Sequence, residues 1–156
     1  MQQTGEAASG DLHAMLLSHA PALTAYRLTF VAESFLARLN GRMEAERGIA
    51  GAQFAVMFCL SVRDGTTAQE IADATQRPKN SLSRAVRALE AKGLIERRQD
   101  PVDQRRQPMG LSPEGRRLFR RLEALAAEQE ATMLAPLTSE ERKTLAGLLM
   151  RMAGTF

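Results

Sequence analysis

Cysteine and aromatic residues are scarce in this sequence. Its 156 residues include one cysteine, Cys59, no tryptophan and 4% aromatic residues. One cysteine excludes an internal disulfide, and disulfides are typical of small secreted proteins. Residues 1–11 have no basic start and no long apolar run, and no stretch approaches the ~18 apolar residues of a membrane span. We therefore expect a cytoplasmic protein without a signal peptide or a membrane partner.

Combinations of residues that perform catalysis or hold a metal are also missing. There is no nucleophile beside a base and no glycine loop that would cradle a phosphate. His13 and His19 are six residues apart, which places them on different faces of a helix, and no cysteine or acid completes a ligand set. We therefore expect no metal, no cofactor and no enzymatic activity.

What the sequence does contain is a basic block. The whole chain has 21 Lys and Arg against 18 Asp and Glu, a net charge of +3. Between residues 77 and 121, however, 13 basic residues face 5 acidic ones, so this block carries +8 and the rest of the chain −5. Such a block favours an anionic partner, with nucleic acid favoured over a membrane.

The stretch from Pro78 to Leu94 has two contrasting faces on a helix. Its apolar residues recur at steps of three and four, which predicts one buried stripe. These are Leu82, Ala85, Val86 and Leu89. The other side carries cations and short hydrogen-bonding side chains, which suit a nucleic-acid groove, although a solvated charged face is the plainer alternative. The residues on this side are Lys79, Asn80, Ser83, Arg84 and Arg87.

A shorter helix is predicted immediately before this one. Thr67 and Glu70 have the spacing of a capping box, in which each side chain bonds the backbone N–H of the other. The helix is expected over residues 68–74, with a turn at 75–77. Pro78 suits the first position of the next helix, because the N–H that proline lacks would have no partner there. Two helices joined by a short turn, the second one basic, are typical of a helix-turn-helix.

A hairpin is predicted directly after the basic helix. Gly93 is placed to cap that helix, and residues 94–98 form a first strand. Residues 107–111 form a weaker return strand, and Pro108 predicts that this strand is an edge or is interrupted, because proline cannot donate to a ladder. The connecting turn ends in Arg105 and Arg106, which we expect to reach an adjacent minor groove. Such a hairpin is called a wing.

Long helices are predicted on both sides of this region. Residues 12–46 show a helical pattern so apolar that it favours an oligomer interface, and residues 52–63 are apolar on most sides, as in a central core helix. Ser112 followed by Pro113 predicts the start of a helix that runs to about residue 134. A last helix is predicted over residues 140–152, after a second capping-box pattern.

At residues 70–115 the sequence resembles the winged helix-turn-helix of the MarR (multiple-antibiotic-resistance regulator) family. The segments that carry the resemblance are TAQEIA (67–72), SLSRAVRALE (81–90), KGLIER (92–97), DPVDQRR (100–106) and LSPEG (111–115). The resemblance implies a two-fold dimer held together by its N- and C-terminal helices. It further implies binding to pseudo-palindromic double-stranded DNA, usually as a repressor, and release by a small anionic or aromatic ligand.

The resemblance also assigns roles to single residues. Asn80, Ser81, Ser83 and Arg84 match the family's recognition-helix positions, Arg105 matches its wing arginine, and Asp103 matches the acid that steadies the wing. The chain departs from the family at the turn 75–77, which lacks the usual glycine, at Pro78, where a capping serine is common, and at Gln104, which replaces a frequent arginine. These departures bear on the operator sequence and leave the class of protein unchanged.

We therefore predict a mainly α fold with a small β-hairpin wing. Residues 49–112 form the winged helix-turn-helix, residues 12–48 and 113–156 form a helical dimerisation region, and residues 1–11 are disordered. The predicted role is that of a dimeric transcriptional regulator. Two alternatives remain open: a redox-responsive regulator that uses Cys59, although an apolar helix favours core packing for that thiol, and a module for protein contacts. The predicted DNA-binding residues are Lys79, Asn80, Ser81, Ser83, Arg84, Arg87, Arg105 and Arg106, with Asp103 orienting the wing.

Overall fold

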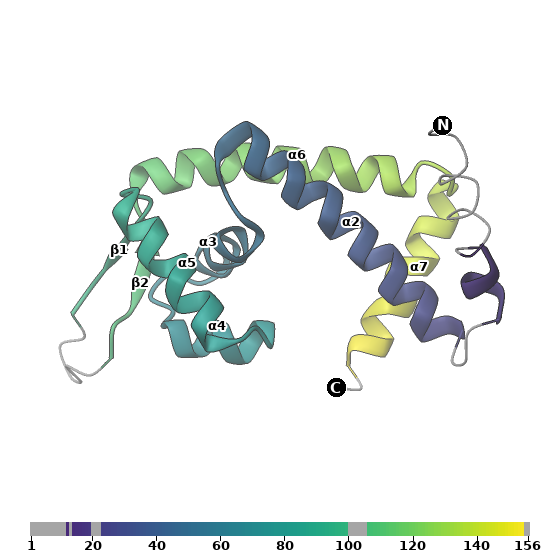
Figure 1. The fold of residues 1–156 in the computed structure, drawn as a ribbon, viewed down its shortest axis with the longest axis horizontal. Coiled ribbons are helices and arrows are strands. Elements are labelled where there is room, and N and C mark those ends of the chain that lie inside the picture. Colours follow the sequence, from purple (N-terminus) through teal and green to yellow (C-terminus); the bar gives the residue numbers. More distant parts are fainter. Residues whose placement is uncertain (1–11, 13, 20–22, 100–105, 155–156) are drawn as a thin grey trace, which may run out of the picture. The chain divides into compact units, whose positions relative to one another are not determined.

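The computed structural model describes residues 12, 14–19, 23–99 and 106–154. It is mainly helical with one two-stranded antiparallel hairpin, as predicted (Figure 1). Residues 14–19 are also helical. The chain divides into two compact units, residues 1–38 and 39–156, with the boundary inside α2. The elements are α2 (Leu23–Arg47), α3 (Gly51–Val62), α4 (Ala68–Thr75), α5 (Lys79–Ala91), β1 (Ile95–Arg97), β2 (Met109–Leu111), α6 (Pro113–Leu134) and α7 (Ser139–Ala153).

Within the first unit, large apolar side chains lie at the surface. Val31 and Leu36 of α2 are exposed, as are Met15 and Leu16 in the preceding helical residues. The helical structure expected over residues 12–46 is present on both sides of the undescribed residues 20–22, in residues 14–19 and in α2. Among the described residues, no helix is both long and apolar enough to cross a membrane.

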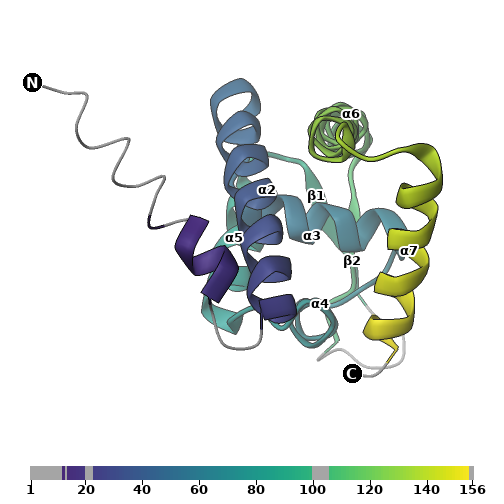
Figure 2. The same cartoon turned by 90° about the vertical axis from the view of Figure 1, so that its right-hand side faces the viewer.

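The second unit is built around α3, which packs against α5 on one side and α6 on another. In Figure 1, α3 is seen end-on between these two helices, and in the perpendicular view of Figure 2 it runs across the unit. Val56, Met57 and Leu60 of α3 are buried, in keeping with a central core helix. The stripe predicted on α5 is buried against it, and each large aliphatic side chain so buried contributes about 1.5–3 kcal/mol. The stripe residues Leu82, Ala85, Val86 and Leu89 are at most 5% exposed.

The helix-turn-helix follows the predicted pattern with one correction. The Thr67 hydroxyl accepts a hydrogen bond from Glu70 N at 3.3 Å, and Glu70 Oε2 accepts one from Thr67 N at 2.7 Å, which confirms the capping box at the start of α4. Gln76 adopts the left-handed conformation, with φ +52°, where the family commonly has glycine. Pro78 is the N-cap of α5 and not its first helical residue, because its ψ of 130° is still extended.

The two strands of the wing are shorter than predicted, and β2 has hydrogen-bonded neighbours on both of its sides. β1 pairs with β2 in the register Ile95 to Leu111. β2 begins only after Pro108, so the strand is cut short where the sequence predicted an interruption. It is not an edge strand, however, because Met109 N donates to Thr66 O at 3.0 Å and Gly65 N donates to Met109 O at 2.9 Å. A bridge from the connection before α4 thus covers the far side of β2.

The junction between the wing and α6 explains the segment LSPEG. Ser112 Oγ accepts from Gly115 N at 2.9 Å and donates to Gly93 O at 2.7 Å, so one hydroxyl caps α6 and ties it to the end of α5. A Cβ atom at Gly115 would lie 1.9 Å from the carbonyl oxygen of Leu94. Only glycine therefore lets the first turn of α6 sit on the chain that enters β1.

We expect Gly115→Ala to lower the free energy of unfolding by about 1–3 kcal/mol, the usual range for an overpacked core. The same change at Gly147 is the matched control, because an added Cβ there meets nothing within 4 Å. Gly147→Ala in the interior of α7 should raise stability by up to about 1 kcal/mol. Chemical denaturation of both variants at one protein concentration measures the difference, and equal tolerance of the two changes would contradict the role of Gly115.

Candidate nucleic-acid interface

The face of α5 opposite its buried stripe is open to solvent. Lys79, Asn80, Ser83, Arg84 and Arg87 are all exposed on it, and Ser81 is half-buried. The structure thus brings together every recognition-helix residue that the sequence singled out. Their roles toward DNA remain predictions.

The hydrogen-bonding groups on this face are largely uncommitted. Arg84 Nε lies 3.4 Å from the carbonyl oxygen of Asn80, and Arg87 Nε donates to Ser83 O at 3.2 Å, so both side chains fold back along the helix. Among the described residues, neither guanidinium has an ion-pair partner. The side chains of Lys79 and Asn80 make no hydrogen bond within this part of the chain. Free donors at the positive end of a helix suit an anionic partner.

The wing arginines are placed differently. Arg106 is about half exposed, and its Nη2 lies 3.5 Å from Glu70 Oε1 at the start of α4. Arg105 and Asp103 lie outside the described residues, so the predictions for them stay predictions.

Sequence reasoning missed a set of ion pairs at the base of the wing. Arg98 pairs with Asp64 through both guanidinium Nη atoms, at 2.5 and 3.2 Å. Arg97 pairs in the same bidentate way with Glu90 of α5 and also donates to Gln107. Part of the +8 charge of the basic block is therefore already balanced inside the protein. The only signal in the sequence was that Asp64 and Glu70 precede the basic block. Their positions did not indicate which arginines they would pair with.

Glu70 is held in its ionised form. The backbone N–H of Thr67 is the main cause that lowers the pKa of this carboxyl group, followed by the Thr67 hydroxyl, and the charges of Arg63 and Arg106 act in the same direction. Arg63 Nη2 donates to Glu70 Oε1 at 2.8 Å. One carboxylate thus caps α4 and contacts cations from both α3 and the wing.

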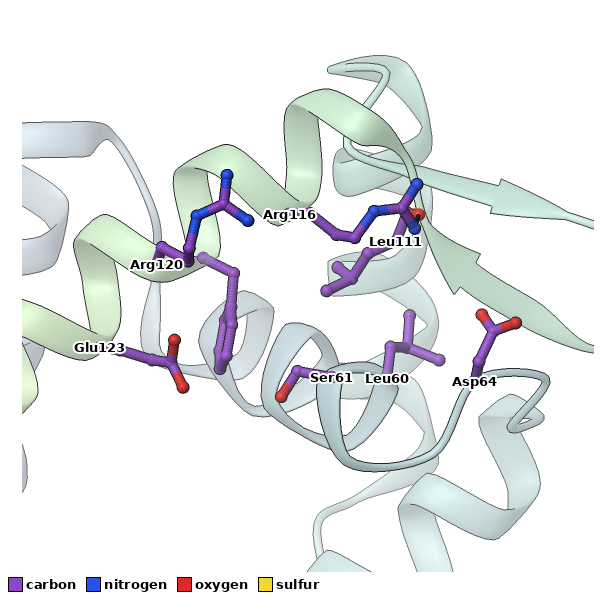
Figure 3. Close-up of a pocket in the computed structure, with 8 residues that line it drawn as sticks. Leu60, Ser61, Asp64, Leu111, Arg116, Arg120 and Glu123 are labelled. Carbon is purple, nitrogen blue, oxygen red and sulfur yellow. Dashed lines mark hydrogen bonds between the residues drawn. The ribbon is translucent and has the colours of Figure 1, made fainter.

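A cleft of about 370 Å³ opens between α3 and α6 (Figure 3). Arg116 and Arg120 approach it from α6, and Leu60 of α3 supplies apolar surface. Phe119 also lines the cleft. Arg116 Nη1 donates to Leu111 O at 2.5 Å, whereas Arg120 has no ion-pair partner among the described residues. The lining is completed by Ser61, Asp64, Leu111 and Glu123.

A second groove, of about 440 Å³, lies between α3 and α4 and includes Cys59. The pKa of this thiol is raised, mainly by burial, and the positive charge of Arg77 offsets only part of that rise. A raised pKa means less thiolate, which is the reactive form. In the part of the chain that the structure describes, no three metal-binding side chains come together.

Comparisons with known proteins agree with this geometry. The sequence model of the MarR family matches residues 50–106, which run from the start of α3 into the wing. The chain is 30% identical over 105 residues to a putative transcriptional regulatory protein for the hcr operon of Thauera aromatica, which covers 67% of this chain and 63% of that protein's length. It is 28% identical over 131 residues to the HTH-type transcriptional regulator BilQ of Clostridium symbiosum, covering 84% and 90% of the two chains.

Among solved structures, the fold is similar to that of the S. aureus MepR–DNA complex. The TM-score is 0.72 at 28% identity, covering 85% of this chain and 97% of that one. This chain has a winged helix-turn-helix with an exposed polar helix face, and it is similar to a transcriptional regulator and to a protein solved with DNA. Together these findings define a DNA-binding transcriptional regulator. Over residues 50–106, from α3 into the wing, the chain thus matches the MarR family.

The Glu70 carboxylate gives a test of stability against pH. Its pKa is lowered in the folded state, so its contribution is present above the unfolded value of about 4.3 and is lost as pH falls through the folded value. We expect Glu70→Gln to reduce the loss of stability below about pH 4.3. Glutamine keeps the capping-box geometry, so the change isolates the charge. Glu141→Gln in α7 is the matched variant, because Thr138 donates the equivalent two hydrogen bonds, from its backbone N–H and its hydroxyl. These bonds lower the pKa of Glu141 in the same way. An acid-unfolding profile of Glu70→Gln that superimposes on the unmodified protein would refute this contribution.

Proposed function

We propose that the protein is a dimeric, sequence-specific regulator that binds pseudo-palindromic double-stranded DNA, acts as a repressor and is released by a small ligand. The observation that carries the proposal is the division of α5 into a fully buried stripe and an opposite face of uncommitted donors. A helix so divided within a winged module presents its free face to the major groove. The similarity to a regulator solved with DNA supports this use of the face.

Different residues on this face have different tasks. Lys79 and Arg87 hold phosphates and set the position of the helix, which carries no sequence information. Asn80 and Arg84 read base edges, asparagine pairing with adenine and arginine with guanine. Ser81 and Ser83 add short hydrogen bonds beside them. The wing contact falls to Arg105, oriented by Asp103.

We expect Arg84→Ala to lose discrimination between the operator and a mismatched duplex by about 1–3 kcal/mol, because one bidentate base contact is removed. Lys79→Ala should weaken all duplexes about equally and flatten the dependence of affinity on salt, because one phosphate contact and its released counterions are lost. Fluorescence anisotropy with matched and mismatched duplexes at several salt concentrations separates the two. Unchanged discrimination in Arg84→Ala would remove it from the reading role.

Dimerisation is supported by the unburied apolar surface of α7. No residue of this helix is buried within the chain. Leu148, Leu149 and Met152 are 41–48% exposed and fall with Leu145 on one helical stripe, which a second copy would cover. Two copies place two recognition helices about 34–36 Å apart, one turn of DNA, and double the contacts of a single chain.

We expect Leu149→Glu to shift the protein from dimer to monomer at micromolar concentration and to weaken operator binding more than tenfold. A buried charge at a subunit interface is strongly unfavourable. Met150→Glu is the control, because Met150 lies on the opposite side of α7 from the stripe and is 74% exposed. Sedimentation velocity measures both variants, and a Leu149→Glu dimer as stable as the unmodified one would place the interface elsewhere.

Release by a small organic anion is supported by the cleft between α3 and α6. Its volume of about 370 Å³ falls within the usual range for small-molecule sites. Arg120 offers a guanidinium without an ion-pair partner among the described residues, and Phe119 offers an apolar wall. An anion with an apolar body matches this pairing of features.

A further inference from the structure

The base of the wing is joined to the connection between α3 and α4 by more than backbone hydrogen bonds. Thr66 bridges Met109 through the main chain. On either side of that bridge, one carboxylate reaches one arginine of the wing: Asp64 pairs with Arg98, and Glu70 with Arg106. Arg98 follows β1 and Arg106 precedes β2, so each arm of the wing has its own anchor.

The ion pair between Asp64 and Arg98 requires glycine at position 110. Arg98 Nη1 lies 2.5 Å from Asp64 Oδ2, and Nη2 lies 3.2 Å from Oδ1, which is a bidentate arrangement. A Cβ atom on Gly110 would lie 2.2 Å from Asp64 Oδ1 and 2.6 Å from Arg98 Nη2. The ion pair therefore occupies the space that any other residue at position 110 would fill.

The second anchor uses an acid that is already fixed in place. Glu70 Oε2 is bound by the backbone N–H and hydroxyl of Thr67, at 2.7 and 2.8 Å. Its other oxygen, Oε1, lies 3.5 Å from Arg106 Nη2. Because the capping box holds the carboxylate, Arg106 meets an acceptor whose position is set by the start of α4.

An anion site is the competing explanation for this group of arginines. Arg97, Arg98 and Arg106 border a small cavity of about 200 Å³ together with Gln99 and Gln107. Each of the three arginines, however, has a carboxylate within ion-pair distance, namely Glu90, Asp64 and Glu70 respectively. Glu70 is shared with Arg63, but every arginine of the group has a carboxylate partner, which disfavours an anion site.

We infer that Arg98 and Arg106 are positioning residues, which Asp64 and Glu70 hold so that the wing stays fixed relative to α4 and α5. The inference rests on the proposed DNA-binding function. A wing fixed beforehand loses less conformational freedom when wing and recognition helix engage DNA together, so affinity rises without a new contact. In this role the charge of Arg106 serves the fold of the wing and not a phosphate.

Variants that keep every cation test the inference. Asp64→Asn removes the first anchor, and Gly110→Ala displaces it without changing any charge. We expect each to weaken binding to an operator duplex about two- to fivefold, the range for an exposed ion pair. The sign decides between explanations, because removing an acid near a DNA interface would by electrostatics alone strengthen binding. Asp73→Asn is the matched control: it is the same change on exposed α4, where Asp73 only accepts a bond from Gln69.

A second measurement uses the free protein. Arg98 N donates to Pro108 O at 2.8 Å and Met109 N donates to Thr66 O at 3.0 Å, so these amides report opening at the base of the wing. We expect both to exchange with solvent hydrogen faster in Asp64→Asn and Gly110→Ala than in Asp73→Asn, while amides of the buried α5 stripe stay unchanged in all three.

The outcomes separate the two proposals. Weaker binding in Asp64→Asn with faster exchange at Arg98 and Met109 supports the anchor. Binding that is equal or tighter, with unchanged exchange, overturns it. If the unmodified protein binds no duplex at low salt, the proposed function fails, and hydrogen exchange alone still decides whether Asp64 holds the wing. Should Gly110→Ala not fold, Asp64→Asn carries the test.

Discussion

Burial of one stripe of α5 against α3 fixes the direction in which the rest of that helix faces. Leu82, Val86 and Leu89 are at most 1% exposed, and α3 behind them has its own buried row. A helix packed so tightly cannot rotate, because even a small turn would bring apolar side chains into water. The polar face therefore points outward as a consequence of the core and needs no contact of its own to hold it there.

The other parts of the winged module are tied to this pair of helices by specific bonds. The capping box sets where α4 starts, and Gln76 turns the chain so that α5 returns across it. Ser112 joins the end of α5 to the start of α6. Asp64, Thr66 and Glu70 join the wing to the first turn of α4 and to the connection before it. Main-chain bonds and short ion pairs thus position the elements around a core that supplies most of the stability.

Local patterns carried most of the fold prediction. The stripe on α5, both capping boxes and the start of α6 at Pro113 depend on residues three or four positions apart, and all are present. What the sequence did not disclose depends on distant residues. Asp64 and Arg98 are 34 positions apart, and the pairing of Thr66 with Met109 removes β2 from the edge of the sheet. Periodicity cannot predict such pairs, because side-chain patterns describe a face and not its partner.

The candidate site divides in the same way. The exposure of the predicted recognition residues on one face of α5 could be predicted, because the opposite face of that helix is plainly apolar. The use of Arg97, Arg98 and Arg106 could not, since a count of charges along the chain treats every arginine as available. Among the described residues of the basic block, four cations have carboxylate partners, namely Arg97, Arg98, Arg106 and Arg117. Two of those partners, Asp64 and Glu70, precede the block in sequence.

The close contact between Gly115 and Leu94 fixes the first turn of α6, so that a change in the tilt of this helix is largest at its other end. Since an added Cβ would lie 1.9 Å from the Leu94 carbonyl oxygen, the first turn of this helix has no freedom to slide over the chain that enters β1. The 22 residues of α6 extend about 33 Å at 1.5 Å per residue. A tilt of about 5° at the seated end displaces the far end by about 3 Å over that length. Whatever holds the far end of α6 therefore also sets the angle at which the wing is carried.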